Sequence, residues 1–114
     1  MEKKYDLEDR TLEFSKEIIR LCKILPANTI NFVLIDQVMR SGTSIGANYR
    51  EANETETKKD FRFRIRICLR ESKETFYWLE LIKEANPKFQ KTDILMSEAG
   101  ELVKIFGKIL DKAR

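Results

Sequence analysis

The sequence of 114 residues contains no histidine, and this absence excludes more chemistry than any other feature of its composition. A histidine general base, a Ser/His/Asp or Cys/His catalytic pair, a mixed Cys/His zinc site and a carboxylate/His di-iron site all need an imidazole. An enzyme would have to work through carboxylates, tyrosine, lysine or cysteine alone. We therefore expect the chain not to be an enzyme and to hold no cofactor or metal.

Cysteine and long apolar runs are also scarce. The two cysteines, Cys22 and Cys68, lie far apart without CxxC spacing, and the first residues do not resemble a signal peptide. This pattern is typical of a protein of the reducing cytoplasm. The longest apolar runs span only a few residues, so we expect no transmembrane helix and no membrane partner. Both cysteines fall at or beside apolar stripes, where a thiol behaves as a small buried hydrophobe.

Four glycines and two prolines leave few breaks in the chain, and the apolar residues recur at helical spacing. Composition is 42% apolar and 36% charged, which suits one compact domain over residues 1–114. Suitable N-caps are Asp6 for the first helix, either Asn28 or Thr29 for the second, and Thr57 for the third. The helices are expected at about residues 6–25, 29–55, 58–85 and 92–113. Short loops between them favour an all-α, antiparallel up-down-up-down four-helix bundle.

The most distinctive stretch runs from Arg40 to Ala52 and is rich in small residues. Each helical glycine costs about 1 kcal/mol relative to alanine, so Gly42 and Gly46 need a compensating gain. Close approach of a neighbouring helix is one explanation. A phosphate-binding loop is another, but the lysine and the preceding strand of such a loop are missing.

Polar residues also occupy inward positions of the second and third helices. Asn48, Ser72 and Thr75 are expected there, and an unpaired buried polar group costs roughly 1–3 kcal/mol. We expect them to pair with each other or with Ser44 and Glu51. A metal site is the alternative for the carboxylates of this region, which belong to Glu51, Glu71 and Glu74. Such a site would lack both a histidine ligand and the repeated inward glutamate pair of di-iron bundles.

The net charge of +3 is unevenly distributed. Residues 58–73 carry seven basic residues against two acidic ones, while residues 28–57 are acidic. Arg62, Arg66 and Arg70 are spaced by four and share one helix face. Such a row can contact phosphates, and the candidate nucleic-acid-binding residues are Lys58, Lys59, Arg62, Arg66, Arg70 and Lys73. The alternative is a solvated face that pairs with Glu54 and Glu56.

Aromatic residues accompany this basic row. Phe61 is expected in the core, whereas Phe63 lies off the apolar stripe and could either pack or stack on a base. Tyr77 and Trp78 flank Leu79 and cannot all face one core. At least one of them is expected at a protein interface, which favours self-association.

Two stretches carry a family resemblance, VMRSGTSIGANYREA from Val38 to Ala52 and ICLRESKETFYWLEL from Ile67 to Leu81. With Asp60 and Phe61, they resemble the bacterial four helix bundle proteins, also called 23S rRNA intervening-sequence proteins. A more distant similarity is to the accessory protein of diversity-generating retroelements, which presents a basic surface to nucleic acid. The resemblance implies a four-helix bundle and a ring, pentameric in known cases, with no established catalytic residue.

The resemblance also implies a set of signature residues for packing and assembly: Arg40, Ser44, Asn48, Glu51, Phe61, Glu71, Glu74, Tyr77 and Trp78. The leading hypothesis is therefore a ring-forming, non-enzymatic bundle whose assembly gathers weakly basic faces into a surface for RNA or DNA. The alternative is an adaptor that binds a partner protein through Tyr77 and Trp78, with no nucleic-acid activity.

Overall fold

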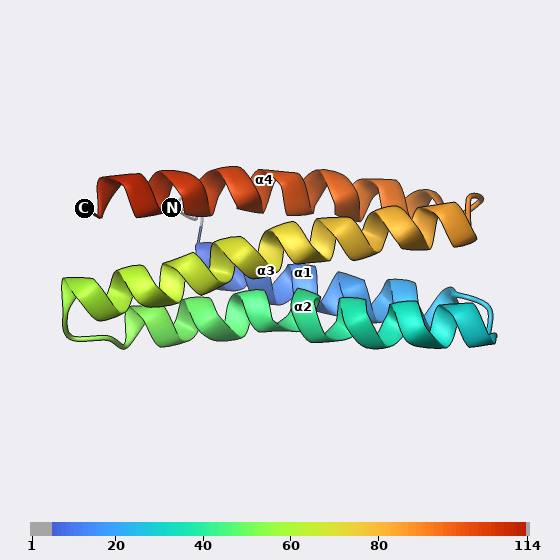
Figure 1. Cartoon of the computed structure of the whole chain (residues 1–114), viewed down its shortest axis with the longest axis horizontal. Coiled ribbons are helices and arrows are strands. Elements are labelled where there is room, and N and C mark those ends of the chain that lie inside the picture. Colours follow the sequence, from blue (N-terminus) through green and yellow to red (C-terminus); the bar gives the residue numbers. More distant parts are fainter. Residues whose placement is uncertain (1–5, 114) are drawn as a thin grey trace, which may run out of the picture.

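The computed structural model describes residues 6–113, and these fold into four helices. The helices are α1 (Leu7–Ile24), α2 (Thr29–Asn53), α3 (Lys58–Ala85) and α4 (Gln90–Lys112). Each helix runs antiparallel to the next along the chain, so Figure 1 shows an up-down-up-down bundle. The predicted all-α four-helix bundle is confirmed. Among residues 6–113, no helix has a stretch long and apolar enough to span a bilayer.

Side-chain caps define where three of the helices begin. The side chains of Asp6, Asn28 and Thr57 accept hydrogen bonds from backbone N–H groups of the first turns of α1, α2 and α3, at 2.8–3.0 Å. Such a cap satisfies a donor that has no partner within the helix. The predicted N-caps Asp6 and Thr57 are therefore confirmed, and of the two candidates for the second helix it is Asn28 that caps α2.

The fourth helix begins at Gln90, two residues before the predicted Thr92. Its N-cap, Phe89, makes no side-chain cap bond and instead packs against the hydrophobic core. Packing of this half-buried ring fixes where the chain enters the helix, and Thr92 becomes a buried residue of the first turn. The prediction relied on polar capping residues, and an apolar anchor leaves no such signal.

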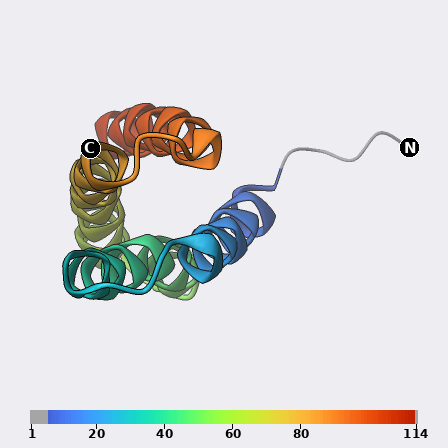
Figure 2. The ribbon, with the colours of Figure 1, turned by 90° about the vertical axis from the view of Figure 1, so that its right-hand side faces the viewer.

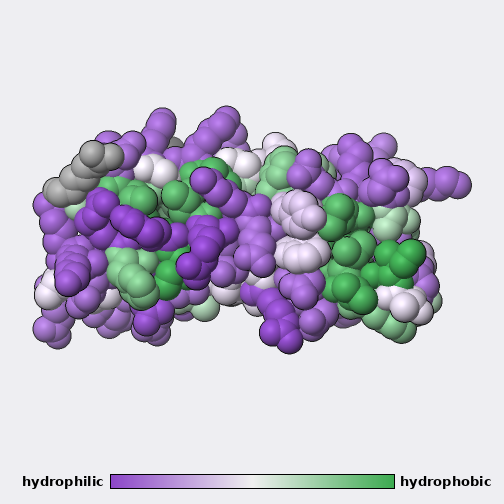
Figure 3. All heavy atoms as spheres, viewed as in Figure 1, coloured by the Kyte–Doolittle hydropathy of each residue, from purple (hydrophilic) through white to green (hydrophobic). Residues whose placement is uncertain are grey.

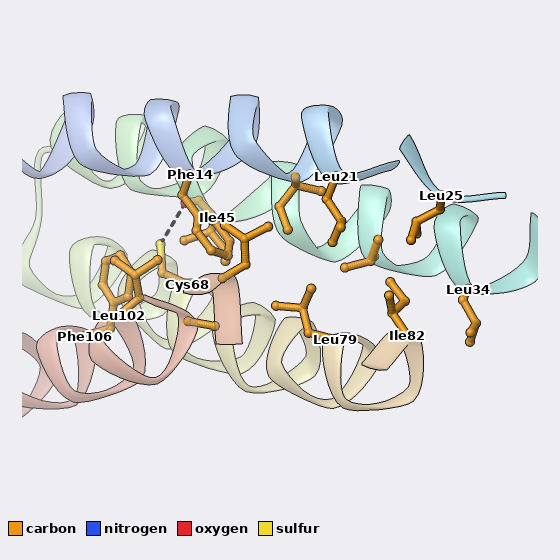
Figure 4. Close-up of a cluster of buried hydrophobic side chains, with 14 of the residues drawn as sticks. Phe14, Leu21, Leu25, Leu34, Ile45, Cys68, Leu79, Ile82, Leu102 and Phe106 are labelled. Atoms are coloured by element: carbon orange, nitrogen blue, oxygen red, sulfur yellow. Dashed lines mark hydrogen bonds between the residues drawn. The ribbon is translucent and has the colours of Figure 1, made fainter. Parts of the chain in front are cut away.

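All four helices contribute buried side chains to one core. Figure 4 shows Phe14, Ile45, Cys68 and Phe106, each from a different helix, pointing toward one another. The Cys68 thiol is fully buried 3.6 Å from the carbonyl oxygen of Ile45, and burial raises its pKa to about 12. It is therefore an uncharged core residue at neutral pH, as the sequence predicts.

The small residues of α2 lie against α1. A Cβ atom added to Gly46 would stand 3.0 Å from Thr11 Oγ1 and 3.2 Å from Thr11 Cβ, and one added to Gly42 would stand 3.0 Å from Ile18 Cγ1. A methyl group at either position would therefore force the facing side chain of α1 to shift by a few tenths of an ångström. The predicted close approach of helices is confirmed, and it explains why glycine occurs in the middle of a helix.

Helices α1 and α4 are joined by charged side chains, unlike α1 and α2, which meet at glycines. Viewed end-on, the helices follow the order α1, α2, α3, α4 in an arc, with α1 and α4 at its ends (Figure 2). Arg10 donates two hydrogen bonds to the carboxylate of Glu98, at 2.5 and 2.7 Å, and Lys91 forms an ion pair with Glu17 at 2.6 Å. Ionic contacts therefore close the bundle between its first and last helices.

Candidate interaction surface on the third helix

The outer face of α3 crosses the front of the molecule, with α4 on one side and α2 on the other (Figures 1 and 2). Lys59, Arg66 and Arg70 are exposed on this helix, and so are Lys58 and Lys73. Successive members of a row spaced by four lie about 6 Å apart along the helix axis. The structure therefore places most of the candidate basic residues in solvent, along one helix.

Arg62 differs from the other members of the row because it is half-buried and bonded to α4. Its Nη1 donates to the carbonyl oxygen of Leu110 at 2.5 Å. Leu110 lies in the last turn of α4, where carbonyl groups lack partners within the helix and carry partial negative charge. This bond fixes the guanidinium at the junction of α3 and α4 and leaves part of its donor capacity available.

The acidic residues expected to neutralise the row do not do so. Among residues 6–113, no ion pair joins this row to Glu54 or Glu56, and Lys59, Arg66 and Lys73 form none at all. Arg70 makes a single long contact of 4.0 Å with Glu71. The pairing with Glu54 and Glu56 is therefore not formed in this part of the chain, although the face itself is solvated. Glu54 is the C-cap residue of α2, one position beyond the helix.

The two phenylalanines of this region lie in different environments. Phe61 is half-buried and packs against the core, as predicted. Phe63 is 61% exposed and lines a shallow hollow together with Lys59, Arg62 and Arg66. The structure therefore assigns Phe63 to the surface, directly among the basic residues.

The other end of the same face is apolar. Ile30 and Val33 of α2 are 63% and 58% exposed, and Tyr77 of α3 is 53% exposed. Tyr77 contacts the half-buried Trp78 edge-on, with ring centroids 5.2 Å apart. In Figure 3 the hydrophobic colour gathers where α3 ends and α2 begins, while the half where α3 begins is mainly hydrophilic with smaller apolar areas. We call these the apolar half and the basic half of the α3 face.

The inward polar network is only partly as expected. Thr75 and Ser41 are both buried, and their hydroxyl groups lie 2.9 Å apart across α2 and α3. Ser72 is buried but bonds within its own helix, to the carbonyl oxygen of Cys68 at 2.8 Å. The pairing of helices through Thr75 is confirmed, although its partner is Ser41 rather than the residues named from the sequence.

The expected inward position of Asn48 is wrong. It is half-buried in the contact between α2 and α3, where it donates to the carbonyl oxygen of Ser44 at 2.9 Å and accepts from Arg64 at 3.0 Å. Its place on the flank of the apolar stripe allowed either position. Arg64, a basic residue outside the row, is half-buried and held by this bond. Glu51, the other proposed partner, is exposed.

The remaining signature residues follow the sides of α2 and α3. Arg40 is exposed and forms an ion pair with Asp36 at 3.2 Å. Glu74 is exposed and lies 3.5 Å from the indole nitrogen of Trp78, whereas Glu71 is half-buried. Within residues 6–113, no three carboxylate or thiol side chains gather as metal ligands would. The carboxylates named as an alternative metal site are therefore not brought together.

One buried pair was not anticipated from the sequence. The side-chain amides of Asn31 in α2 and Asn86 at the end of α3 donate to each other, at 3.0 and 2.9 Å. Both residues are buried. Asn86 precedes Pro87, and in the sequence this pair indicates only a helix end, so the Asn86 side chain carries no visible signal. Asn31 lies three residues before the buried Leu34 and seven before the buried Val38, and this helical spacing is the one clue that the sequence offers.

Comparison with known proteins agrees with this architecture. The family profile of the 23S rRNA-intervening sequence protein matches residues 3–108. The chain belongs to this family. A crystal structure of a protein of unknown function, from the S23 ribosomal protein family of Bacteroides thetaiotaomicron, is similar to this member of the family, with 36% identity and a TM-score of 0.83. The similarity covers 92% of this chain and 98% of that one. No curated protein matches the sequence.

Proposed function

We propose that this family member is a non-enzymatic, self-assembling helical bundle that binds nucleic acid through the basic half of the α3 face. The observation that carries the proposal is that Lys59, Arg66 and Lys73 are exposed on α3 with no ion pair among residues 6–113. Cations that are already paired within a protein gain little by contacting phosphate. Unpaired cations release the counterions condensed on a phosphate backbone, and this release drives non-specific binding.

Assembly is the second part of the proposal. One chain carries a formal charge of +3, which is too weak to hold a polyanion by itself. A ring of five copies, as the family resemblance implies, carries five times +3, or +15. The exposed Ile30, Val33 and Tyr77 of the apolar half support self-association, because side chains of this kind are usually covered by a partner. The free thiols Cys22 and Cys68 suit a cytoplasmic setting.

Charge reversal on α3 tests nucleic-acid binding. We expect Arg66→Glu/Arg70→Glu to reduce the affinity for fluorescently labelled single-stranded RNA and duplex DNA at least tenfold at low salt, measured by anisotropy. The matched control is Lys16→Glu/Lys23→Glu, two exposed lysines of α1 that give the same change in net charge. If both double variants lose affinity equally, only net charge matters and the α3 site is excluded. Absence of any binding by the unaltered protein would reject the nucleic-acid role.

A second candidate function is docking of a partner protein. One observation favours it, the exposure of the apolar half. In that case the basic half only keeps the protein soluble, and Arg66→Glu/Arg70→Glu leaves partner binding intact. A pull-down with purified unaltered and charge-reversed protein distinguishes the two functions. The adaptor function is supported if the charge-reversed protein retains the same partner.

A further inference from the structure

We infer that Phe63 and the cations around it form a stacking site for an unpaired base, so that the basic half of the α3 face prefers single-stranded to duplex nucleic acid. This inference rests on the proposed nucleic-acid function and makes it more specific. It starts from the shallow hollow that Phe63 shares with Lys59, Arg62 and Arg66.

The ring of Phe63 is unusual in being both exposed and surrounded by cations. It is 61% exposed, although an aromatic ring of this size normally gains stability by burial. Lys59 and Arg66 are exposed on the same hollow, and neither forms an ion pair among residues 6–113. The site therefore combines an accessible π-face with unpaired positive charge.

This combination fits a nucleotide better than an apolar protein surface. An apolar partner covering Phe63 would also remove water from Lys59 and Arg66 and supply no compensating charge, which is costly. A nucleotide supplies both complements at once, a flat base for the ring and a phosphate for the cations. Single-strand-binding proteins use this pairing of a basic groove with aromatic platforms.

The position of Arg62 strengthens the site. Its bond of 2.5 Å to the carbonyl oxygen of Leu110 holds the guanidinium at the edge of the hollow. A side chain fixed before binding loses less conformational entropy when a ligand arrives. Arg62 therefore acts as a positioned cation, whereas Lys59 and Arg66 are free to follow the strand.

The exposed ring of Phe63 should also give single strands a higher affinity than duplexes. In a duplex, the bases are stacked on each other and their faces are unavailable, so Phe63 would meet only sugar and phosphate. In a single strand, a base can leave its neighbours and stack on the ring. Duplex binding, by contrast, would depend only on the cations and not on Phe63.

The experiment compares Phe63→Ala with the unaltered protein on three labelled probes: oligo(U), oligo(dT) and a blunt duplex of equal length. Removing one aromatic stacking partner is expected to weaken binding of both single strands about fivefold to a hundredfold, and to change duplex affinity less than about twofold. Phe63→Trp should restore single-strand affinity. Weakening of only one single strand would assign the site to RNA or to DNA and would still support it.

Phe32→Ala is the matched control. Phe32 is also 61% exposed, but it lies at the start of α2, at the opposite end of the bundle from Phe63, so its removal should leave all three affinities unchanged. Equal affinity of Phe63→Ala and unaltered protein for oligo(U) and oligo(dT) would overturn the stacking site while the proposed nucleic-acid function stood. Loss of duplex and single-strand binding together would show that Phe63 does not discriminate between them. No binding to any probe by unaltered protein would reject both proposals.

Discussion

At the scale of single residues, the close contact between α1 and α2 depends on the absence of side chains at Gly42 and Gly46. Thr11, which faces Gly46, is fully buried and its hydroxyl bonds to the carbonyl oxygen of Leu7 at 2.9 Å, so it cannot turn away without losing that bond. Gly107, in contrast, has no atom within 4 Å of the position that a Cβ would take. The space at Gly46 is therefore too small for a side chain, whereas the space at Gly107 is large enough for one.

We expect Gly46→Ala to lower the free energy of unfolding by up to about 2 kcal/mol. The added methyl group costs about 1–3 kcal/mol in overpacking against Thr11, and a gain of about 1 kcal/mol in helix propensity offsets part of that cost. Gly107→Ala receives the same propensity gain without the clash and should stabilise the fold by up to about 1 kcal/mol. Urea unfolding followed by circular dichroism measures both. A Gly46→Ala protein as stable as Gly107→Ala would mean that α1 is not held tightly against α2.

The sequence showed this close approach correctly but not the positions of several polar side chains. The glycines were informative because a cost of about 1 kcal/mol per residue demands a packing reason. Asn48 was wrongly predicted to face inward and Phe63 was left open, because each lies on the flank of an apolar stripe. A flanking side chain faces either a neighbouring helix or solvent, and the choice depends on the rotation of the helix, which only tertiary contacts fix.

At the scale of elements, the ends of α2 and α3 are joined by the buried Asn31–Asn86 pair. Asn31 also donates to the carbonyl oxygen of Pro26 at 2.8 Å, so the pair links the connection between α1 and α2 to the end of α3. Asn86 donates further to the carbonyl oxygen of Ile82 at 3.0 Å. Such a reciprocal pair restricts α2 and α3 to one longitudinal register, since a shift by one residue would leave both amides unsatisfied.

A double-mutant cycle tests this coupling. Asn86→Ala should destabilise the bundle by about 1–3 kcal/mol because it leaves the buried Asn31 amide without its partner. Asn31→Ala/Asn86→Ala should cost less than the sum of the two single changes, with a coupling of at least about 0.5 kcal/mol. Asn53→Ala, which removes only an exposed contact with Glu8, serves as the control and should change stability by less than about 0.5 kcal/mol. Strict additivity at Asn31 and Asn86 would contradict the coupling.

The sequence predicted the helices themselves almost completely, because period and caps are local properties. It missed the start of α4, where the half-buried ring of Phe89 replaces a capping side chain. It also missed the Asn31–Asn86 pair, whose members are separated by most of two helices. Local patterns therefore gave the elements, whereas the contacts that set their register required the three-dimensional arrangement.

At the scale of the whole molecule, the α3 face joins two surfaces with different requirements. The apolar half would be most stable when covered, whereas the proposed nucleic-acid binding requires the basic half to remain open. Both conditions hold together if copies associate through the apolar half and leave the basic halves side by side. Association of this kind raises the local concentration of binding sites along one strand.

Uncharged changes in the apolar half should therefore weaken nucleic-acid binding without touching the basic half. We expect Val33→Gln/Tyr77→Gln to reduce the mass measured by light scattering from that of an oligomer to that of the 13.5 kDa chain. Both side chains are more than half exposed, so the fold itself should be retained.

The same variant should bind oligo(U) at least tenfold more weakly and with a shallower dependence on salt, because one chain contacts fewer phosphates than an assembly. Phe32→Gln/Ile94→Gln exchanges two other exposed apolar residues, one from α2 and one from α4, and should leave both mass and affinity unchanged. If this control dissociates instead, the copies meet through a different face. If Val33→Gln/Tyr77→Gln becomes monomeric and still binds with full affinity and an unchanged salt slope, one α3 face is sufficient, and assembly serves a purpose other than gathering charge.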